Sequence, residues 1–279
     1  MQIWGQTLFK NEERWLWYCV TSVIDHLDKL LLWDTGSTDN SFKIAQELAK
    51  KYPDKIDLRQ YGEITPETFK DARQAMLNET KADWFLVVDA DEIWPKRSIE
   101  EVIKEINFRN NIIESIVVPT INLVGDVFHY QPPSAGRYKF GEKVGHYNLR
   151  AIKIRIPGLH SQNPHGTWGW ADNNNQMIQD RGSGKVAFVD APYLHATFLP
   201  RGEKRSDDFA VPKRARKLKY EIGENLPLDY FYPEVFFIPR PKTIISPWGT
   251  MNNSYKFRAF IETPLRKLNR RLISGKAGY

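Results

Sequence analysis

The chain has 279 residues, of which 41% are hydrophobic and 27% are charged, as in a folded globular protein. No apolar run approaches the roughly 20 residues that span a bilayer, which argues against a membrane-spanning protein. The formal net charge is +6, and the basic excess lies mostly in residues 201–219 and 255–276. Such charge attracts phosphorylated molecules, anionic lipid or nucleic acid. No zinc-knuckle, RNP or helix-turn-helix signature accompanies it, so we expect no nucleic-acid partner.

The N-terminus and the cysteine content indicate a compartment. Residues 1–5 lack a charged n-region and a long apolar h-region, so we expect no signal peptide. The single Cys19 lies in an apolar helical pattern and has no second cysteine to pair with, which fits a reducing environment. We therefore expect a cytoplasmic protein.

Strands and helices are predicted to alternate through the first half of the chain. Asn11 is a candidate cap for a helix with a buried face from Trp15 to Val23. Further helices are predicted after the turn 34–41, from Thr65-Pro66, and from a capping box at Ser98. Such alternation indicates right-handed crossovers and a mostly parallel sheet of the Rossmann type, flanked by helices. The predicted strands cover residues 3–9, 30–33, 56–61, 84–88 and 116–121.

The most informative stretch of the chain is residues 84–92, Trp-Phe-Leu-Val-Val-Asp-Ala-Asp-Glu. An apolar run of this kind predicts a strand buried on both faces. Asp89 and Asp91 follow it, and alternation along an extended chain points both to the same side. Two carboxylates there suit Mg²⁺ or Mn²⁺ shared with a diphosphate. The alternative is a solvated acidic turn.

The predicted strand order places three polar clusters together. With the order 3-2-1-4, the direction of the sheet reverses between the first and fourth strands, and ligands bind at such a point. Lys10-Asn11-Glu12 would then face Asp89-Ala90-Asp91, with Asp34 one strand further along. We expect a binding site there.

The second half has weaker periodicity. Residues 157–184 predict a long loop containing Trp168 and Trp170, and long loops in compact domains are usually functional. Short extended pieces are predicted at 186–189 and 193–195, and a basic helix at 213–222.

Four motifs now resemble family 2 glycosyltransferases, which have the GT-A fold. Residues 9–13 (FKNEE) resemble the opening of that family, and residues 32–41 (LWDTGSTDNS) resemble its Asp-x-Gly-Ser-x-Asp turn. Residues 69–75 are similar to the helix before its metal-binding strand, and residues 84–92 to the strand with its Asp-x-Asp motif. The resemblance covers residues 3–122 well and the remainder loosely.

The resemblance implies inverting transfer of a sugar from a nucleotide sugar, most often a UDP-sugar. By position, Asp34 would bind the nucleotide base near Gly36 of the same turn, and Lys10, Asn11 and Glu12 would line its pocket. Arg73 would lie near the sugar or diphosphate, and Asp89 would face the ribose and the metal. Asp91 and His195 would ligate Mn²⁺ or Mg²⁺.

Each of these residues also has a structural alternative. Asp34 can cap the following helix, Arg73 can be a solvated helix residue, and His195 can be a hydrogen-bonded core histidine. Glu92 is expected to support the site rather than to bind the metal.

Inversion needs a general base near the acceptor hydroxyl, usually a carboxylate. Here the chain departs from the family, whose relatives often carry Glu-Asp or His-Glu in this region. We expect Asp172, beside Trp170, to be the base, with Asp190 as the second candidate.

The resemblance also divides the chain. Residues 1–200 would form the GT-A domain, with a nucleotide-sugar half (1–122) and a loop-rich acceptor half (123–200), and residues 201–279 a basic extension packed on it. The basic and apolar pattern of 255–273 can contact the inner face of an anionic membrane, which suits a glycan or lipid-linked acceptor of the cell envelope. The alternative, which we favour, is a helix packed on the domain with its basic face in water.

Other functions were weighed. A haloacid-dehalogenase-type phosphatase also ends a strand in Asp-x-Asp, but it needs Thr or Val where this chain has Ile93. A nucleotidyltransferase would need a Gly-rich first loop, and a calcium loop would need further oxygen ligands. A catalytically decayed nucleotide-sugar-binding protein is the remaining alternative.

Overall fold

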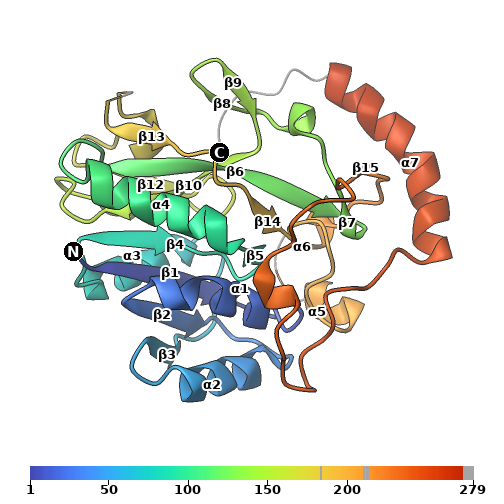
Figure 1. Cartoon of the computed structure of the whole chain (residues 1–279), viewed down its shortest axis with the longest axis horizontal. Helices are drawn as coiled ribbons and strands as arrows, with labels where there is room; N and C mark the ends of the chain where they lie inside the picture. Colours follow the sequence, from blue (N-terminus) through green and yellow to red (C-terminus); the bar gives the residue numbers. More distant parts are fainter. Residues whose placement is uncertain (183, 210, 212–213, 273–279) are drawn as a thin grey trace.

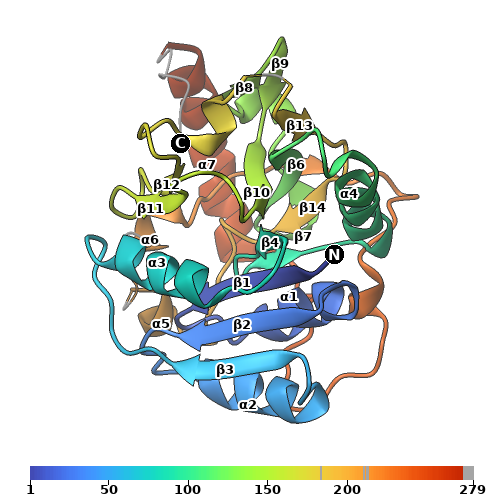
Figure 2. The same cartoon turned by 90° about the vertical axis from the view of Figure 1, so that its left-hand side faces the viewer.

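The computed structural model describes the chain except residues 183, 210, 212–213 and 273–279. Its centre is a mixed sheet with the strand order β15-β7-β6-β10-β4-β1-β2-β3 (Figures 1 and 2). The last four neighbours in this order run parallel, so the predicted order 3-2-1-4 is confirmed. These strands are β4 (Trp84–Val87), β1 (Ile3–Phe9), β2 (Lys29–Asp34) and β3 (Ile56–Gln60).

Helices cover both faces of the parallel strands. In β2, Leu30 and Leu32 pack into the core that holds helices α1 (Leu16–Val23), α2 (Ser41–Lys51) and α4 (Lys96–Arg109). The alternate residues Leu31 and Trp33 pack with Ala72 and Met76 of α3 (Phe69–Glu79) on the opposite face. This follows from the two-residue period of a strand. Every residue of β4 is buried, as its unbroken apolar run predicts.

An antiparallel strand extends the sheet beyond β4. Strand β10 (Tyr147–Lys153) lies between β4 and the long β6 (Ser115–Val124) and is antiparallel to both. Strands β13 (Val186–Phe188) and β14 (Tyr193–His195) pair in parallel with β6, and β14 also pairs with β5 (Glu92–Ile93). Strands β7 (Asp126–Tyr130) and β15 (Glu224–Asn225) complete the sheet. Two hairpins lie apart from it: β8 (Tyr138–Phe140) with β9 (Lys143–Gly145), and β11 (His160–Gln162) with β12 (Gly169–Ala171).

Two helices begin at residues other than those predicted. Helix α3 starts at Phe69 because Thr65 and Thr68 bond to each other's backbone in the preceding turn. Helix α4 starts at Lys96, and Ser98 is not a cap because its hydroxyl donates to the carbonyl of Pro192. A residue that bonds elsewhere in the fold is not available to cap.

The C-terminal region folds into short helices and one long one. Helix α5 spans Arg205–Phe209, and α6 spans Arg214–Lys217, shorter than the predicted 213–222, of which residue 213 is outside the described part. Helix α7 (Asn253–Leu272) continues through Pro264, which is exposed, so that water can satisfy the backbone group left unpaired there. None of the helices in the described residues combines the length and apolarity needed to cross a bilayer.

Candidate active site

A cavity of about 630 Å³ opens beyond the carboxyl ends of the parallel strands. Lys10 after β1, Thr35 after β2 and the Asp89–Asp91 tip after β4 all line it. The parallel topology predicts a ligand site at this edge, where the strand order reverses. The opposite wall comes from β10, from the end of β14 and from Arg201, Arg214, Lys217 and Lys219.

Asp89 is held between two arginines. Its Oδ1 accepts a hydrogen bond from Arg73 Nη2 at 2.8 Å, and its Oδ2 accepts one from Arg150 Nη2 at 3.0 Å. Burial works against ionisation, but the charges of Arg150 and Arg73 outweigh it and lower the pKa of Asp89. About a third of the side chain, 35%, is exposed toward the cavity. Asp89 is therefore an oriented anion that a ligand can reach.

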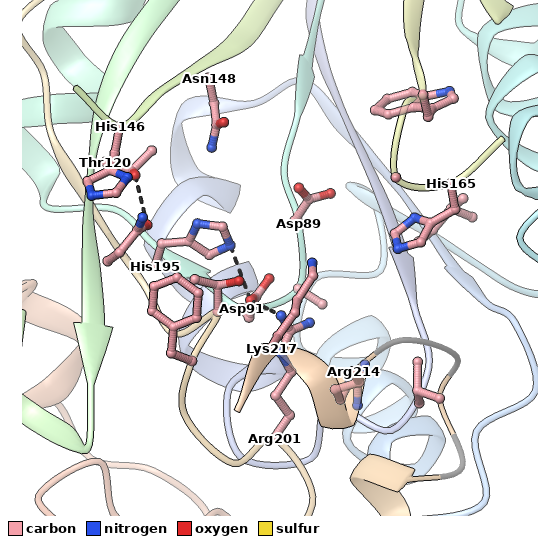
Figure 3. A pocket seen from close by; sticks show the side chains of 18 of the residues that line it. Asp89, Asp91, Thr120, His146, Asn148, His165, His195, Arg201, Arg214 and Lys217 are labelled. Carbon is pink, nitrogen blue, oxygen red and sulfur yellow. Dashed lines mark hydrogen bonds and ion pairs between the residues drawn. The ribbon is translucent and has the colours of Figure 1, made fainter. Parts of the chain in front are cut away.

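Asp91 lies deeper and meets an arginine and a histidine side chain (Figure 3). Its Oδ2 is 2.6 Å from Arg201 Nη2 and 3.2 Å from His195 Nε2. Burial opposes ionisation, but Arg201 and His195 more than compensate, so the pKa of Asp91 is lowered. His195 reaches this point because β14 pairs with β5, which sets His195 opposite Glu92. Asp91 and His195, predicted 104 positions apart in the chain as metal ligands, are thus neighbours.

Arg201 also links the tip of β4 to the end of β1. Its Nη1 donates to Glu12 Oε1 at 2.8 Å, and Arg214 Nη2 donates to the same oxygen at 2.6 Å. Arg214 donates as well to the carbonyls of Lys10 and Asn11. Charge-assisted bonds of this kind are short and directional. They attach Arg201 and Arg214, which belong to the segment predicted to be a basic extension packed on the domain, directly to the strand ends.

A second set of contacts supports Asp89 from behind. The guanidinium of Arg150 pairs with Glu92, and its Nε donates to the Tyr193 hydroxyl at 3.0 Å. Tyr193 in turn donates to Glu92 at 2.7 Å and stacks on Trp94, with ring centroids 4.4 Å apart. Glu92 is fully buried. Its position agrees with the prediction of a supporting rather than a metal-binding residue.

The residues predicted for the nucleotide pocket have two different roles. Lys10 and Glu12 line the cavity. Asn11 is fully buried in a left-handed conformation (φ 52°), and its side chain bonds to the turn at Thr38 instead of capping α1. Asp34 accepts the backbone N–H groups of Gly36 and Ser37.

Gly36 has a steric requirement of its own. Its φ is +89°, and a Cβ there would lie 2.8 Å from the Glu63 side chain. Asn11, Asp34 and Gly36 therefore shape the two turns that carry Lys10 and Thr35, and they are not among the residues that line the cavity.

The structure does not favour either predicted base. Asp172 is buried, pairs with Arg181 at 2.6 Å and accepts the backbone N–H groups of Asn174 and Gln176, so it closes a turn outside the cavity. Asp190 is exposed and does not line the cavity. These two predictions are corrected for the same reason. An aspartate that closes a turn and one that faces solvent cannot be told from a catalytic one by position in the chain.

The long loop supplies part of the cavity wall. Trp168 lines the cavity, and the Arg73 guanidinium lies 5.0 Å from its ring centroid. Trp170 is 2% exposed and packs on Phe85, so it is a core residue. His165 also lines the cavity.

The donor set fits a divalent ion in part. Asp91 and His195 offer an oxygen and a nitrogen at one point, and Mg²⁺ or Mn²⁺ is commonly held by one or two carboxylates with substrate phosphates and water. Asp89, also predicted as a ligand, has both oxygens bonded to arginines. No group of three or more His, Cys, Asp or Glu side chains within the described residues is arranged to hold a metal unaided. Asp91 and His195 are therefore the candidate ligands, with substrate oxygens completing the shell.

Three arginines of the site are not predicted from the sequence. Arg150 pairs with Asp89 and Glu92, and Arg201 and Arg214 pair with Glu12, with Arg201 also on Asp91. The basic excess of residues 201–219 was visible as a charge pattern, but nothing in that pattern indicates which cations turn inward.

Comparison with known proteins identifies the family of the chain. Residues 7–169, more than half of the chain, match glycosyl transferase family 2. A TPR repeat-containing protein of Synechococcus elongatus is 34% identical over 87 residues, 30% of this chain and 19% of that protein. This chain therefore spans only a small part of that relative's length.

Solved structures give more distant matches. S. aureus TarS is 13% identical with a TM-score of 0.44, over 71% of this chain and 37% of that chain. A structure of glucosyl-3-phosphoglycerate synthase from Mycobacterium tuberculosis with Mn²⁺, UDP-glucose and phosphoglyceric acid is 16% identical with a TM-score of 0.46, over 78% of each chain.

The family match also removes the phosphatase alternative, because it covers the four motifs and the strand order that carry the site. The chain belongs to glycosyl transferase family 2 and has the GT-A-like α/β architecture expected for it, a mostly parallel sheet flanked by helices.

Proposed function

We propose that the chain is an inverting, metal-assisted glycosyltransferase that moves a sugar from a UDP-sugar to a hydroxyl of a glycan or lipid-linked acceptor of the cell envelope. One observation carries the proposal. Asp91 and His195 meet at the end of β4, at the floor of a cavity that opens where the order of the parallel strands reverses. Ionised oxygen and imidazole donors at such a place suit a nucleoside diphosphate and its cation.

The nucleoside would lie at the ends of β1 and β2. Phe9, Lys10 and Thr35 line the cavity there and offer an apolar ring, a cation and a hydroxyl. The turns behind them are held by Asn11 and Asp34, as described above. Asn11 and Asp34 would then act by positioning the pocket rather than by contacting the base.

The diphosphate would lie between the tip of β4 and residues 201–217. Arg201, Arg214 and Lys217 line this part of the cavity and can donate charge-assisted hydrogen bonds to phosphate oxygens (Figure 3). Asp91 and His195 would hold the divalent ion, which when bound neutralises charge on the leaving diphosphate. The arginines stabilise the same charge from the other side.

The transferred sugar would meet the Asp89 face of the cavity. Arg73 and Arg150 fix both oxygens of Asp89, so its remaining lone pairs point in a set direction. Trp168 next to Arg73 offers a flat apolar surface on which a sugar ring can lie.

Inversion requires a group that takes the proton of the acceptor. Asp172 and Asp190 lie outside the cavity, and among the described lining residues the carboxylates are Glu12, Asp89 and Asp91. Asp89, which is 35% exposed against 4% for Glu12 and 3% for Asp91, is the one that an acceptor hydroxyl can reach. The anomeric configuration of the product, read from its proton NMR coupling constant, tests inversion directly.

The activity is tested by following UDP release from a panel of nucleotide sugars with Mn²⁺ and with EDTA. We expect release that depends on the ion and is lost in Asp91→Asn. The matched control is Asp54→Asn, in an exposed turn that does not line the cavity. Nucleotide binding without turnover of any donor would instead support the decayed binding protein.

A further inference from the structure

Helix α7 presents its apolar side to solvent. Phe257, Phe260, Ile261, Leu265 and Leu268 are 71%, 71%, 52%, 64% and 54% exposed. They recur every three or four residues and therefore form one continuous stripe along the helix. Figure 1 shows α7 at the edge of the molecule, beyond β7 and β15. From the sequence we favoured a helix packed on the domain with its basic face in water; the basic Lys256 and Arg258 are indeed exposed, but the apolar side chains are exposed as well.

The opposite side of α7 attaches the helix to the domain through polar contacts. The Tyr255 hydroxyl donates to the carbonyl of Lys219 at 2.6 Å, and Thr263 Oγ1 accepts the backbone N–H of Ile222 at 2.9 Å. Arg270 pairs with the buried Glu221. These contacts fix the rotation of the helix about its axis, so the apolar stripe faces outward as a property of the fold.

Cations border the apolar stripe. Lys256 and Lys267 are exposed and stand three helical turns apart along one border. Arg258, 54% exposed, stands on the other border. Glu262 is the one acidic residue of the helix, and it pairs with Arg258 and Arg266. An apolar stripe with basic borders is the pattern of helices that lie in a membrane interface.

We propose that α7 docks the protein onto an anionic membrane surface, with its apolar stripe at the boundary of the acyl chains and its lysines among the head groups. The charge of the surface selects this occupant. Two copies of the stripe would place basic borders against each other with no acidic partner, whereas anionic lipid complements them. Membrane docking through α7 does not depend on glycosyltransferase activity.

The position of α7 relative to the cavity deepens the proposed function, on which this step rests. Arg270, on the inner side of α7, lines the catalytic cavity. A membrane against the outer side would then lie about one helix diameter, roughly 10 Å, from the cavity wall. That distance suits an acceptor whose sugar is carried by a lipid anchored in the same membrane.

Docking is tested by flotation with vesicles of phosphatidylcholine alone and of phosphatidylcholine with phosphatidylglycerol. We expect binding to the anionic vesicles, reduced about tenfold or more in a Phe257→Ser, Phe260→Ser, Ile261→Ser variant. The matched control is Phe108→Ser, Ile112→Ser. It removes exposed apolar side chains (85% and 57%) from the C-terminal end of α4 and the turn after it. We expect the control to bind as the unaltered protein does.

The charge requirement is tested separately with Lys256→Glu, Lys267→Glu against Lys50→Glu, Lys104→Glu, all at exposed positions. We expect the first pair to abolish the preference for anionic vesicles and the second to keep it. The proposal is overturned if the unaltered protein does not float, if the serine variant floats equally well, or if the protein is a dimer in solution that this variant makes monomeric. UDP release without vesicles shows that the variants fold, and its absence in every variant would refute the proposed function while leaving the vesicle result readable.

Discussion

The two walls of the cavity are built in different ways. One wall is the ends of β1, β2 and β4, where acidic side chains follow buried strands directly in the chain. The other includes Arg201 and Arg214 from the C-terminal region, and ion pairs attach both residues to the first wall. Arg201 and Glu12, for instance, are 189 residues apart in sequence and 2.8 Å apart in space. The first wall follows from the local sequence pattern, whereas the second is held by ion pairs between residues far apart in the chain. Substitutions in the first wall should therefore lower activity alone, and substitutions in the second should lower both activity and stability.

The largest effect is expected at the tip of β4. Asp91→Asn keeps the shape of the side chain but removes the charge that pairs with His195 and Arg201. We expect kcat to fall about 10³-fold, because neutralisation of the leaving diphosphate depends on this oxygen. Steady-state UDP release measures the effect. An Asp91→Asn enzyme within a few fold of the original would contradict the role proposed for this wall.

The second wall is tested by Arg201→Ala, which leaves Glu12 and Asp91 buried without this guanidinium. We expect a loss of about 10²-fold in kcat together with about 3 kcal/mol of unfolding free energy, since breaking a buried pair leaves uncompensated charge. Urea denaturation and UDP release measure the two quantities. Arg155→Ala, whose side chain is 81% exposed, is the control. Lost activity with unchanged stability would show that Arg201 serves the ligand and not the attachment of the walls.

The coupling of metal and donor follows from the contact between Arg201 and Asp91. We expect Mn²⁺ alone to bind weakly and UDP to strengthen its binding about tenfold or more, because the guanidinium competes with the ion until phosphate is present. Isothermal titration with and without UDP measures this. Equal affinity for Mn²⁺ in both titrations would mean that Arg201 does not compete with the ion for Asp91.

A pH dependence separates Glu92 from the residues it supports. Burial, opposed by the Arg150 charge and aided by that of Asp89, raises the pKa of Glu92 to about 7 from 4.5. The folded state therefore binds the Glu92 proton more tightly than the unfolded state does. The protonated carboxyl stabilises the fold at low pH, and this contribution to the unfolding free energy is lost as the pH rises from the ordinary pKa of 4.5 to the folded-state pKa of about 7. Glu92→Gln should flatten the change of Tm between about pH 5 and about pH 8. Parallel Tm curves for both proteins would contradict the raised pKa.

The smallest effect on activity is expected at Asp172. Asp172→Asn removes the partner of Arg181 in a turn outside the cavity, so Tm should fall while kcat stays within about twofold. Thermal unfolding and UDP release measure both. A large loss of kcat at unchanged Tm would restore the original prediction of Asp172 as the base.

The sequence predicts the first wall well and the second poorly. Strand order and the acidic tip follow from apolar runs and the carboxylates behind them, which are local signals. His195 was found through a family resemblance, and the β14–β5 pairing explains why it arrives there. Arg150, Arg201 and Arg214 carry no such signal, because a surface arginine and an inward one look alike until the fold is known. The exposure of the apolar stripe of α7 was not predicted, since the attachment of the helix depends on polar contacts with Glu221 and Lys219.

The set of paired charges around Asp89 and Asp91 has a consequence for how ligands enter. Glu12, Asp89, Asp91 and Glu92 are matched by Arg73, Arg150, Arg201 and Arg214. The rest of the lining is basic, because Lys10, Lys217, Lys219 and Arg270 also line the cavity and are not members of this set. A cavity with this excess of positive charge attracts anions and repels a free cation. We therefore expect the nucleotide to enter first or to carry the divalent ion with it, so that the ion reaches Asp91 only in the company of phosphate.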